Sequence, residues 1–255
     1  MSASVYVGLD IGTTSIKVAA VTKQLKTVFE KQYAYDYLTP QKGWTEIEPD
    51  TWVEIAVNGL RELFQKLPAE TVKGIGITGQ MHTTVFVNKH GFSVRPAILW
   101  NDNRTKESIP EIKQVLESND QSAHISRIVS TGSPLANLLW IRENEPQLFE
   151  QIDKVLIAKD YVKWKLTGIY TTDYCDASTS SLFDLHMDHW SKEVQELFGL
   201  DSKLFPEVRP ASAIVGELTE ELCKELKLEK AIPVVSGTGD NVASVSYTHL
   251  RAHET

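Results

Sequence analysis

The sequence predicts an α/β protein in which extended strands are framed by helices. Residues 5–9 and 16–21 are short apolar runs on either side of a polar turn, as in a β-hairpin. Between Trp52 and Phe64 the apolar residues recur at helical spacing, and residues 72–78 return to the alternation of a strand. A change of period of this kind along one chain is typical of an α/β domain.

The other elements follow in chain order. A third strand is expected at about residues 28–37, before a turn-rich segment with Pro40, Gly43, Trp44 and Pro49. Pro49 and Asp50 begin the first helix well, and Pro68 ends it. Further strands are predicted at residues 83–87, 94–100 and 232–235. Further helices are predicted at residues 108–119, 135–150, 160–166, 191–198 and 220–228.

Composition excludes several classes of protein. With 42% hydrophobic and 24% charged residues among 255, the chain can bury one core or two small ones. A net charge of −8 and the lack of a polybasic stretch argue against nucleic-acid and membrane-surface partners. The N-terminus enters a strand directly, without a signal-like segment, which predicts a cytoplasmic protein. Cys175 and Cys223 are expected to be buried thiols, because neither has a companion at zinc or disulfide-framework spacing.

The turn between the first two strands has the composition of a phosphate-binding turn. Gly12 allows the main chain to approach an anion closely, and the hydroxyls of Thr13 and Thr14 add donors. A carboxylate such as Asp10 can hold a hydrated Mg²⁺ that offsets phosphate charge. The alternative is an ordinary tight hairpin, since these residue types are common in turns for conformational reasons alone.

Residues 74–79 match the dinucleotide-binding fingerprint as a string, GIGITG. The match is interpreted as a false positive, because the glycines lie within a strand pattern and no helix start follows them.

Two strand ends carry polar side chains that could reach a ligand. Gln80, Met81 and His82 close one predicted strand, and a histidine can donate or accept a hydrogen bond to a sugar hydroxyl. Residues 100–104, WNDNR, close another strand with donors and acceptors suited either to a polyol or to loop capping. The polar run at residues 173–178 can cap a loop or form part of a pocket wall.

Asp240 is the strongest candidate for a catalytic base. It follows a strand and a glycine-rich turn, so its carboxylate can be presented to a cleft and accept a proton from a hydroxyl. Phosphoryl transfer requires little more from side chains than positioning, a metal and such a base. The alternative is that Gly239, Asp240 and Asn241 form a simple turn.

Taken together, five segments of the chain resemble the FGGY carbohydrate kinases. They are residues 9–14 (LDIGTT), 43–46 (GWTE), 79–82 (GQMH), 96–102 (PAILWND) and 237–241 (GTGDN). Within that family the chain looks most like the xylulokinase branch, through Met81 and His82, the Trp-Asn-Asp loop, residues 159–161 (KDY) and residues 173–178. The resemblance extends over nearly the whole chain.

The resemblance implies a ribonuclease H-like lobe, shared by sugar kinases, actin and Hsp70 chaperones, with a mixed sheet flanked by helices. It implies ATP and Mg²⁺ as cofactors, with the nucleotide phosphates held at the turn and Asp10 holding the metal through water. It implies a sugar bound by pocket residues and deprotonated by a base. The residues implied for the phosphates are Asp10, Gly12, Thr13, Thr14 and Lys17, those for the sugar are Gln80, Met81, His82, Asn101, Asp240 and Asn241, and those for catalysis are Asp240 and Asp10.

The implied reaction is ATP-dependent phosphorylation of D-xylulose to D-xylulose 5-phosphate. Gluconate or another ketose is an alternative substrate, and a non-catalytic nucleotide switch of the actin or Hsp70 type is an alternative function. A homodimer is possible.

The resemblance also predicts how the chain is organised. Residues 1–244 are expected to form the N-terminal, sugar-binding domain, and the C-terminal lobe of the family is expected to be absent. Residues 245–255 look like one reading frame of a transposase-type sequencing adapter, so they are expected to be a non-native tail.

Overall fold

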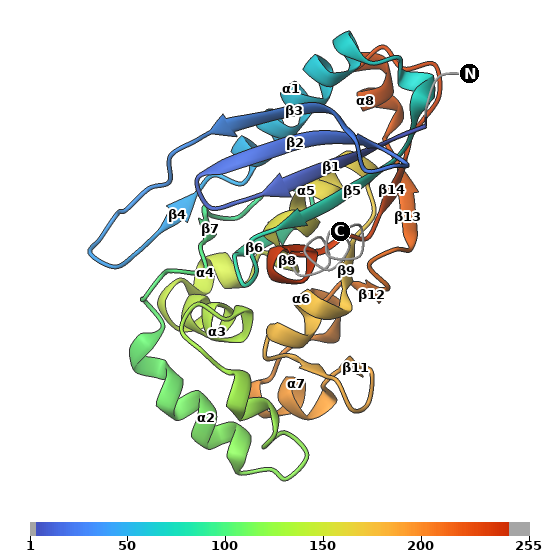
Figure 1. Cartoon of the computed structure of the whole chain (residues 1–255). Coiled ribbons are helices and arrows are strands. Elements are labelled where there is room, and N and C mark those ends of the chain that lie inside the picture. Colours follow the sequence, from blue (N-terminus) through green and yellow to red (C-terminus); the bar gives the residue numbers. More distant parts are fainter. Residues whose placement is uncertain (1–3, 245–255) are drawn as a thin grey trace.

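A computed structural model of the chain describes residues 4–244 (Figure 1). The predicted non-native tail, residues 245–255, lies outside the described residues.

A seven-stranded mixed sheet forms the upper half of the molecule in Figure 1. The strand order is β13-β14-β5-β1-β2-β3, and β15 also pairs with β5. β1 is antiparallel to β2 and parallel to β5, and β2 is antiparallel to β3. The bounds are β1 Val5–Ile11, β2 Ser15–Thr22, β3 Thr27–Ala34, β5 Val72–Gly79, β13 Ile214–Glu217, β14 Pro233–Val235 and β15 Thr238–Gly239.

One face of this sheet is covered by helices α1 (Asp50–Lys66) and α5 (Ala158–Thr167), and α8 (Glu220–Glu225) packs at its edge. Alternate residues of β1 point into this apolar core, where Leu9 and Ile11 are fully buried. The residues between them, such as Gly8 and Asp10, therefore face the other side of the sheet. The pleat of β1 thus leaves Asp10 outside the core.

A second layer contains a four-stranded sheet and a separate apolar cluster. Its strands are β4 Glu46–Ile47, β7 Ala97–Ile98, β6 Thr84–Asn88 and β8 Ile152–Ile157, in that order. Its longer helices are α2 Ile109–Glu117, α3 Pro134–Asn144 and α7 Lys192–Phe198, in the lower half of Figure 1. The short elements are α4 Pro146–Phe149, α6 Tyr174–Thr179, β9 Thr171–Asp173, β10 Phe183–Asp184, β11 His189–Trp190 and β12 Glu207–Arg209. The sequence thus builds two small cores.

The predicted α/β class is confirmed, and the differences lie in particular elements. The strand predicted at residues 94–100 is reduced to the two residues of β7, because Pro96 cannot donate to a ladder. The helix predicted at residues 135–150 is two helices, because Pro146 cannot continue α3 and instead begins α4. β8 was missed: its partner β6 lies far away in the sequence, so no local turn signal marks the pairing.

Residues 74–79 lie inside β5, so their interpretation as a false dinucleotide fingerprint is confirmed. Both cysteines are free, as expected, but they are half-buried rather than buried.

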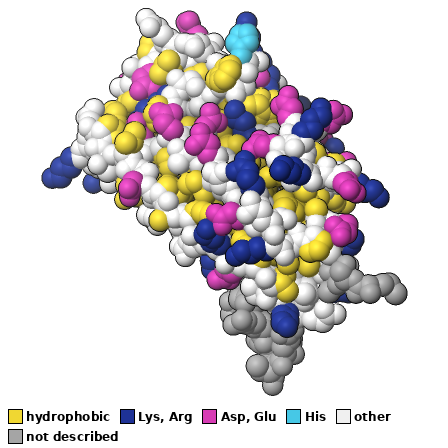
Figure 2. Space-filling model, turned by 90° about the horizontal axis from the view of Figure 1, so that it is seen from above, with side chains coloured by type: hydrophobic (Ala, Val, Ile, Leu, Met, Phe, Trp, Pro, Cys, Tyr) yellow, Lys and Arg dark blue, Asp and Glu magenta, His cyan; other side chains and the backbone are white. Residues whose placement is uncertain are grey.

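The surface carries charges of both signs. On the face in Figure 2, acidic and basic side chains alternate with hydrophobic ones and do not gather into a basic patch. Within residues 4–244, every helix is too short or too polar to cross a lipid bilayer.

Candidate active site

The turn between β1 and β2 is closed by its own backbone. Gly12 N donates a hydrogen bond of 3.0 Å to the carbonyl oxygen of Ser15. A Cβ on Gly12 would lie 3.0 Å from that same oxygen, so a larger residue would have to push the turn open. The Gly12 carbonyl oxygen accepts from the Tyr35 hydroxyl and, at 3.3 Å, from Gln80 Nε2. The predicted phosphate-binding turn is therefore held from two neighbouring segments.

Asp10 is the last residue but one of β1, two residues before Gly12, and faces away from the core. Lys17 is its partner across the hairpin, which sets the two side chains on the same face of the sheet. Burial raises the pKa of Asp10, and the charge of Asp240 raises this pKa further, whereas Lys17 lowers it. The Asp10 carboxyl is thus within electrostatic reach of both Asp240 and Lys17.

The sheet register explains why Asp10 and Asp240 lie at the same end of β5. Thr78 of β5 pairs with Asp10 on one side and with Thr238 of β15 on the other. Neighbouring strands lie about 4.8 Å apart, so the backbones of β1 and β15 are about 10 Å apart at this level. Asp240 comes directly after β15 and is the first residue of a helix that continues through Ser244. Its carboxylate is half-buried.

Two glycines allow β15 to lie against β5. Gly237 has a φ of +78°, and a Cβ there would lie 1.8 Å from the Ile77 carbonyl oxygen. A Cβ on Gly239 would lie 2.7 Å from the Cγ of Met81. Both positions exclude a larger side chain without displacement of the segment that leads to Asp240.

Met81 and His82 follow the end of β5, close to the segment that carries Asp240. Burial lowers the pKa of His82, although the charge of Asp240 acts in the opposite direction. The buried Nδ1 of His82 has no hydrogen-bond partner among the described residues. Asn241 Nδ2 contacts the Met81 Sδ at 3.7 Å. Burial therefore favours the neutral form of His82, and its buried Nδ1 is, within residues 4–244, an unpaired polar atom at this end of β5.

Gln80 has a different environment from its two neighbours. It is 2% exposed. Its Nε2 donates to the Gly12 carbonyl oxygen, and its Oε1 accepts from the Thr83 hydroxyl at 3.0 Å. These contacts join the turn to the end of β5. They give Gln80 a structural reason for its presence, while its predicted contact with the sugar stays a prediction.

The loop after β7 approaches the turn through Trp100, which the sequence marks only as part of the WNDNR segment and not as a binding residue. The Trp100 indole Nε1 donates to the Thr13 hydroxyl oxygen at 3.0 Å, although Trp100 is 49% exposed. Asn101 is half-buried, and its Oδ1 accepts from the Thr45 hydroxyl at 2.9 Å. The signal that could have found Trp100 is a large aromatic residue at a strand end within a polar loop.

The rest of this loop is held by buried charges. Asp102 accepts hydrogen bonds from Thr45 N at 2.6 Å and from the Arg104 Nε at 2.9 Å. Arg104 also donates to Glu46 Oε1 at 2.6 Å. Of the two interpretations of the WNDNR segment, loop capping accounts for Asp102 and Arg104.

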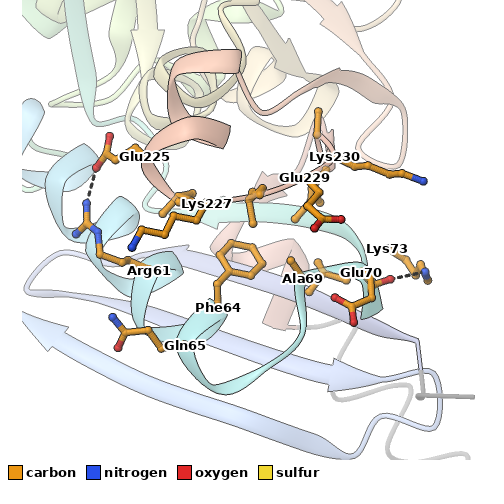
Figure 3. A pocket seen from close by; sticks show the side chains of 15 residues that line it. Arg61, Phe64, Gln65, Ala69, Glu70, Lys73, Glu225, Lys227, Glu229 and Lys230 are labelled. Atoms are coloured by element: carbon orange, nitrogen blue, oxygen red, sulfur yellow. Dashed lines mark hydrogen bonds and ion pairs between the residues drawn. The ribbon is translucent and has the colours of Figure 1, made fainter.

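A cavity of about 320 Å³ opens beside Asp10 on the uncovered face of the sheet. Its lining includes Asp10, Lys17, Thr78 and Thr238. A larger cavity, about 790 Å³, lies between α1, α8 and the start of β5 (Figure 3). Because Val72 and Gly79 mark opposite ends of β5, this second cavity is about 20 Å or more from the turn, and its lining mixes lysines, arginine and glutamates.

The donors near the turn suit a hydrated metal ion better than a protein-enclosed one. Among the described residues, no group of three or more His, Cys, Asp and Glu side chains is arranged to surround a metal. Mg²⁺ retains several waters and is commonly bound through one or two carboxylates together with substrate phosphates. Asp10, with Asp240 nearby, fits that requirement.

Comparison with known proteins agrees with the geometry of the turn, the sheet and the Asp240 segment. Residues 5–246 match the N-terminal domain of the FGGY family of carbohydrate kinases. The chain belongs to this family. Its lobe has the fold of the N-terminal domains of FGGY sugar kinases, which confirms the predicted ribonuclease H-like, actin-type architecture.

Among the relatives of this FGGY chain is the xylulose kinase of Staphylococcus xylosus, which is 32% identical over 235 residues, or 92% of this chain and 49% of that protein. The xylulose kinase of Rhodospirillum rubrum superimposes with a TM-score of 0.87 at 27% identity, over 94% of this chain and 50% of the other. The gluconate kinase of Lactobacillus acidophilus superimposes with a TM-score of 0.86 at 21% identity, over 94% of this chain and 48% of the other. This likeness shows the shared fold. The chain spans about half the length of these relatives.

Proposed function

We propose that this chain is the sugar-binding half of an ATP-dependent kinase that phosphorylates D-xylulose on its C5 hydroxyl, giving D-xylulose 5-phosphate. The observation that carries the proposal is that Asp10 and the segment leading to Asp240 flank the same end of β5, with Met81 packed against that segment. The 32% identity to a xylulose kinase favours this sugar.

In the proposed reaction Asp240 is the general base. Its carboxylate accepts the proton of the attacking hydroxyl as the oxygen approaches the γ-phosphorus, and the bond from that phosphorus to the leaving oxygen of ADP breaks. Asp240 is at the start of a helix and half-buried, so it is directed to one site while water still reaches its carboxylate. His82 and Asn241 orient the sugar by hydrogen bonds, and Asn241 lies next to Met81, which its Nδ2 contacts at 3.7 Å.

The β1–β2 turn is the proposed phosphate site. Gly12, Thr13 and Thr14 offer backbone and hydroxyl donors, and Lys17 adds a positive charge on the same face as Asp10. Mg²⁺, when bound, offsets the phosphate charge that develops during transfer. Asp10 holds the hydrated ion in this scheme, and the proximity of Asp240 increases the negative potential there.

The test is phosphorylation of D-xylulose, gluconate and a set of ketoses with ATP and Mg²⁺, by this chain and by an extended version joined to the second half of a xylulose kinase relative. We expect activity with D-xylulose in the extended protein. Activity with gluconate or another ketose alone would replace the substrate and keep the kinase class.

An extended protein that binds ATP but phosphorylates none of these sugars would instead favour a nucleotide switch. Isothermal titration of D-xylulose without ATP separates the two cases, since a switch of the actin type has no need of a sugar site. Cytoplasmic location and homodimer formation are parts of the same proposal, and gel filtration of the extended protein tests the dimer.

A further inference from the structure

Beneath the segment that leads to Asp240 lies a buried cluster of five ionisable residues. Lys159 Nζ pairs with Asp160 Oδ1 at 2.6 Å, with Asp173 Oδ1 at 2.9 Å and with Asp176 Oδ2 at 2.9 Å. Lys163 Nζ pairs with Asp160 Oδ1 at 2.7 Å. Each of these five side chains is at most 2% exposed. Nothing in the proposed reaction requires a direct contact from any of them.

The cluster makes hydrogen bonds to β15 and to the residues just before it. The Thr238 hydroxyl donates to Asp173 Oδ2 at 2.9 Å. Lys163 Nζ also donates to the carbonyl oxygen of Ser236 at 2.9 Å. A Cβ on Gly239 would lie 3.3 Å from Asp176 Oδ1, so the carboxyl group of Asp176 lies directly under that glycine.

β15 needs this support because it is only two residues long. On the side of β5 it is held by Thr78, whose hydroxyl donates to the Thr238 carbonyl oxygen at 2.7 Å. Thr238 is therefore fixed from both sides, by its carbonyl to the sheet and by its hydroxyl to Asp173. Such a link determines where Asp240, two residues further on, projects.

Stability alone is a weak explanation for five buried ionisable residues. Replacing buried ion pairs with apolar residues of similar volume is often neutral or stabilising, whereas a fixed set of hydrogen bonds defines one geometry. Lys163, Asp173 and Asp176 contact or lie against the segment 236–239. Lys159 and Asp160 pair with members of that group.

We infer that the cluster centred on Lys159 is a positioning device that acts through Asp173 and Thr238 to hold Asp240 beside Asp10. This inference rests on the proposed function for its importance in catalysis, although the positioning itself is a property of this chain. Thr238 and Lys159 are positioning residues, and neither is required to touch substrate.

The test measures the distance-dependent interaction between the two carboxylates directly. In this 255-residue chain, the titration of the Asp10 carboxyl is followed by ¹³C NMR, with assignment by Asp10→Asn. The groups that act on Asp10 are Asp240, which raises its pKa, and Lys17, which lowers it. Asp240→Asn is therefore expected to lower the titration midpoint of Asp10, which defines the full effect of the missing charge.

Thr238→Val removes the hydroxyl link to Asp173 and keeps the shape of the side chain. We expect it to lower the Asp10 midpoint by at least half of the change that Asp240→Asn produces, while Thr238→Ser, which keeps the hydroxyl, restores the parent value. Thr71→Val is the matched control: it removes the hydroxyl bond of 2.6 Å to the Pro68 carbonyl oxygen, just before the far end of β5. A midpoint that is unchanged or raised in Thr238→Val, or equally lowered in Thr71→Val, would overturn the inference.

The same variants in the extended protein give a second readout. Thr238→Val is expected to reduce kcat about tenfold with little change in the KM for sugar, because a displaced base affects the transition state more than binding. An equal loss in Thr71→Val would indicate general destabilisation and count against positioning. If the extended protein phosphorylates no sugar, the proposed function fails, while the titration of Asp10 still decides the positioning.

Discussion

The indole N–H of Trp100 donates a hydrogen bond to the hydroxyl of Thr13, which joins the loop after β7 to the turn between β1 and β2. The two segments are 87 residues apart in the sequence. This bond connects a loop expected near the sugar with a turn expected near the phosphates. It is a physical link between the two halves of the proposed site.

Trp100→Phe removes this donor and keeps most of the ring. The loss of one hydrogen bond corresponds to about 1 kcal/mol, so we expect the affinity of the extended protein for ATP to fall about fivefold. Trp190→Phe is the control, because Trp190 Nε1 donates at 2.8 Å to the Pro206 carbonyl oxygen, away from the turn. Isothermal titration with a non-hydrolysable nucleotide measures both; equal losses would exclude a specific role for Trp100.

Asp240→Asn removes the proposed base without a change in size. In the extended protein we expect kcat to fall by about 10²–10⁴, the usual contribution of a general base, while the affinity for sugar remains similar. Asp201→Asn provides a control at the surface, where the Asp201 side chain is 53% exposed. Steady-state kinetics measure the effect, and parent-like turnover in Asp240→Asn would refute the role of base.

Gly237→Ala tests how tightly β15 is held against β5. The φ of +78° costs an alanine about 1 kcal/mol, and the overlap of its Cβ with the Ile77 carbonyl oxygen adds about 2 kcal/mol or more. Gly168→Ala has nearly the same φ, +75°, but nothing within 4 Å of the added Cβ, so it isolates the first cost. Urea unfolding of this chain should rank Gly237→Ala as clearly the more destabilising; equal losses would mean that β15 shifts freely.

Asp176→Asn tests the charge balance of the buried cluster. Burial raises the pKa of Asp176 to about 7; Lys159 opposes this, and Asp160 and Asp173 add to it. Between about pH 4, near the ordinary pKa of an unfolded aspartate, and pH 7, the folded chain therefore holds a proton that the unfolded chain releases. Stability from this group is lost as pH rises through that window.

Asparagine cannot ionise, so the Asp176→Asn variant does not lose folding stability from this position as the pH rises. We expect the stability of the variant relative to the parent to be more favourable at pH 8 than at pH 5. Urea unfolding of parent and variant gives the difference in their unfolding free energies at each pH. When the differences at pH 5 and pH 8 are compared, the contributions of the other titrating groups largely cancel. A difference that is independent of pH, or larger at pH 5, would contradict the raised pKa.

The sequence alone determined the α/β class, the first hairpin, helix α1 and the strand β5. It did so because these elements have strong periodicity and clear end signals, such as Pro68 after α1. The same local signals marked Asp10, His82 and Asp240, since each follows or ends a strand. The family resemblance added the roles expected of them.

Only the tertiary structure decided which of these residues meet. The pairing of β15 with β5 brings Asp240 to the same end of the sheet as Asp10, and no local pattern predicts that residues 230 positions apart share this place. The sequence likewise marked residues 173–178 as a polar run and residues 159–161 through the family resemblance, but their contacts around Lys159 depend on the packing of α5 against β9 and α6. Local propensity is a property of neighbours in the chain, whereas buried charges take the partners that the folded backbone brings within reach.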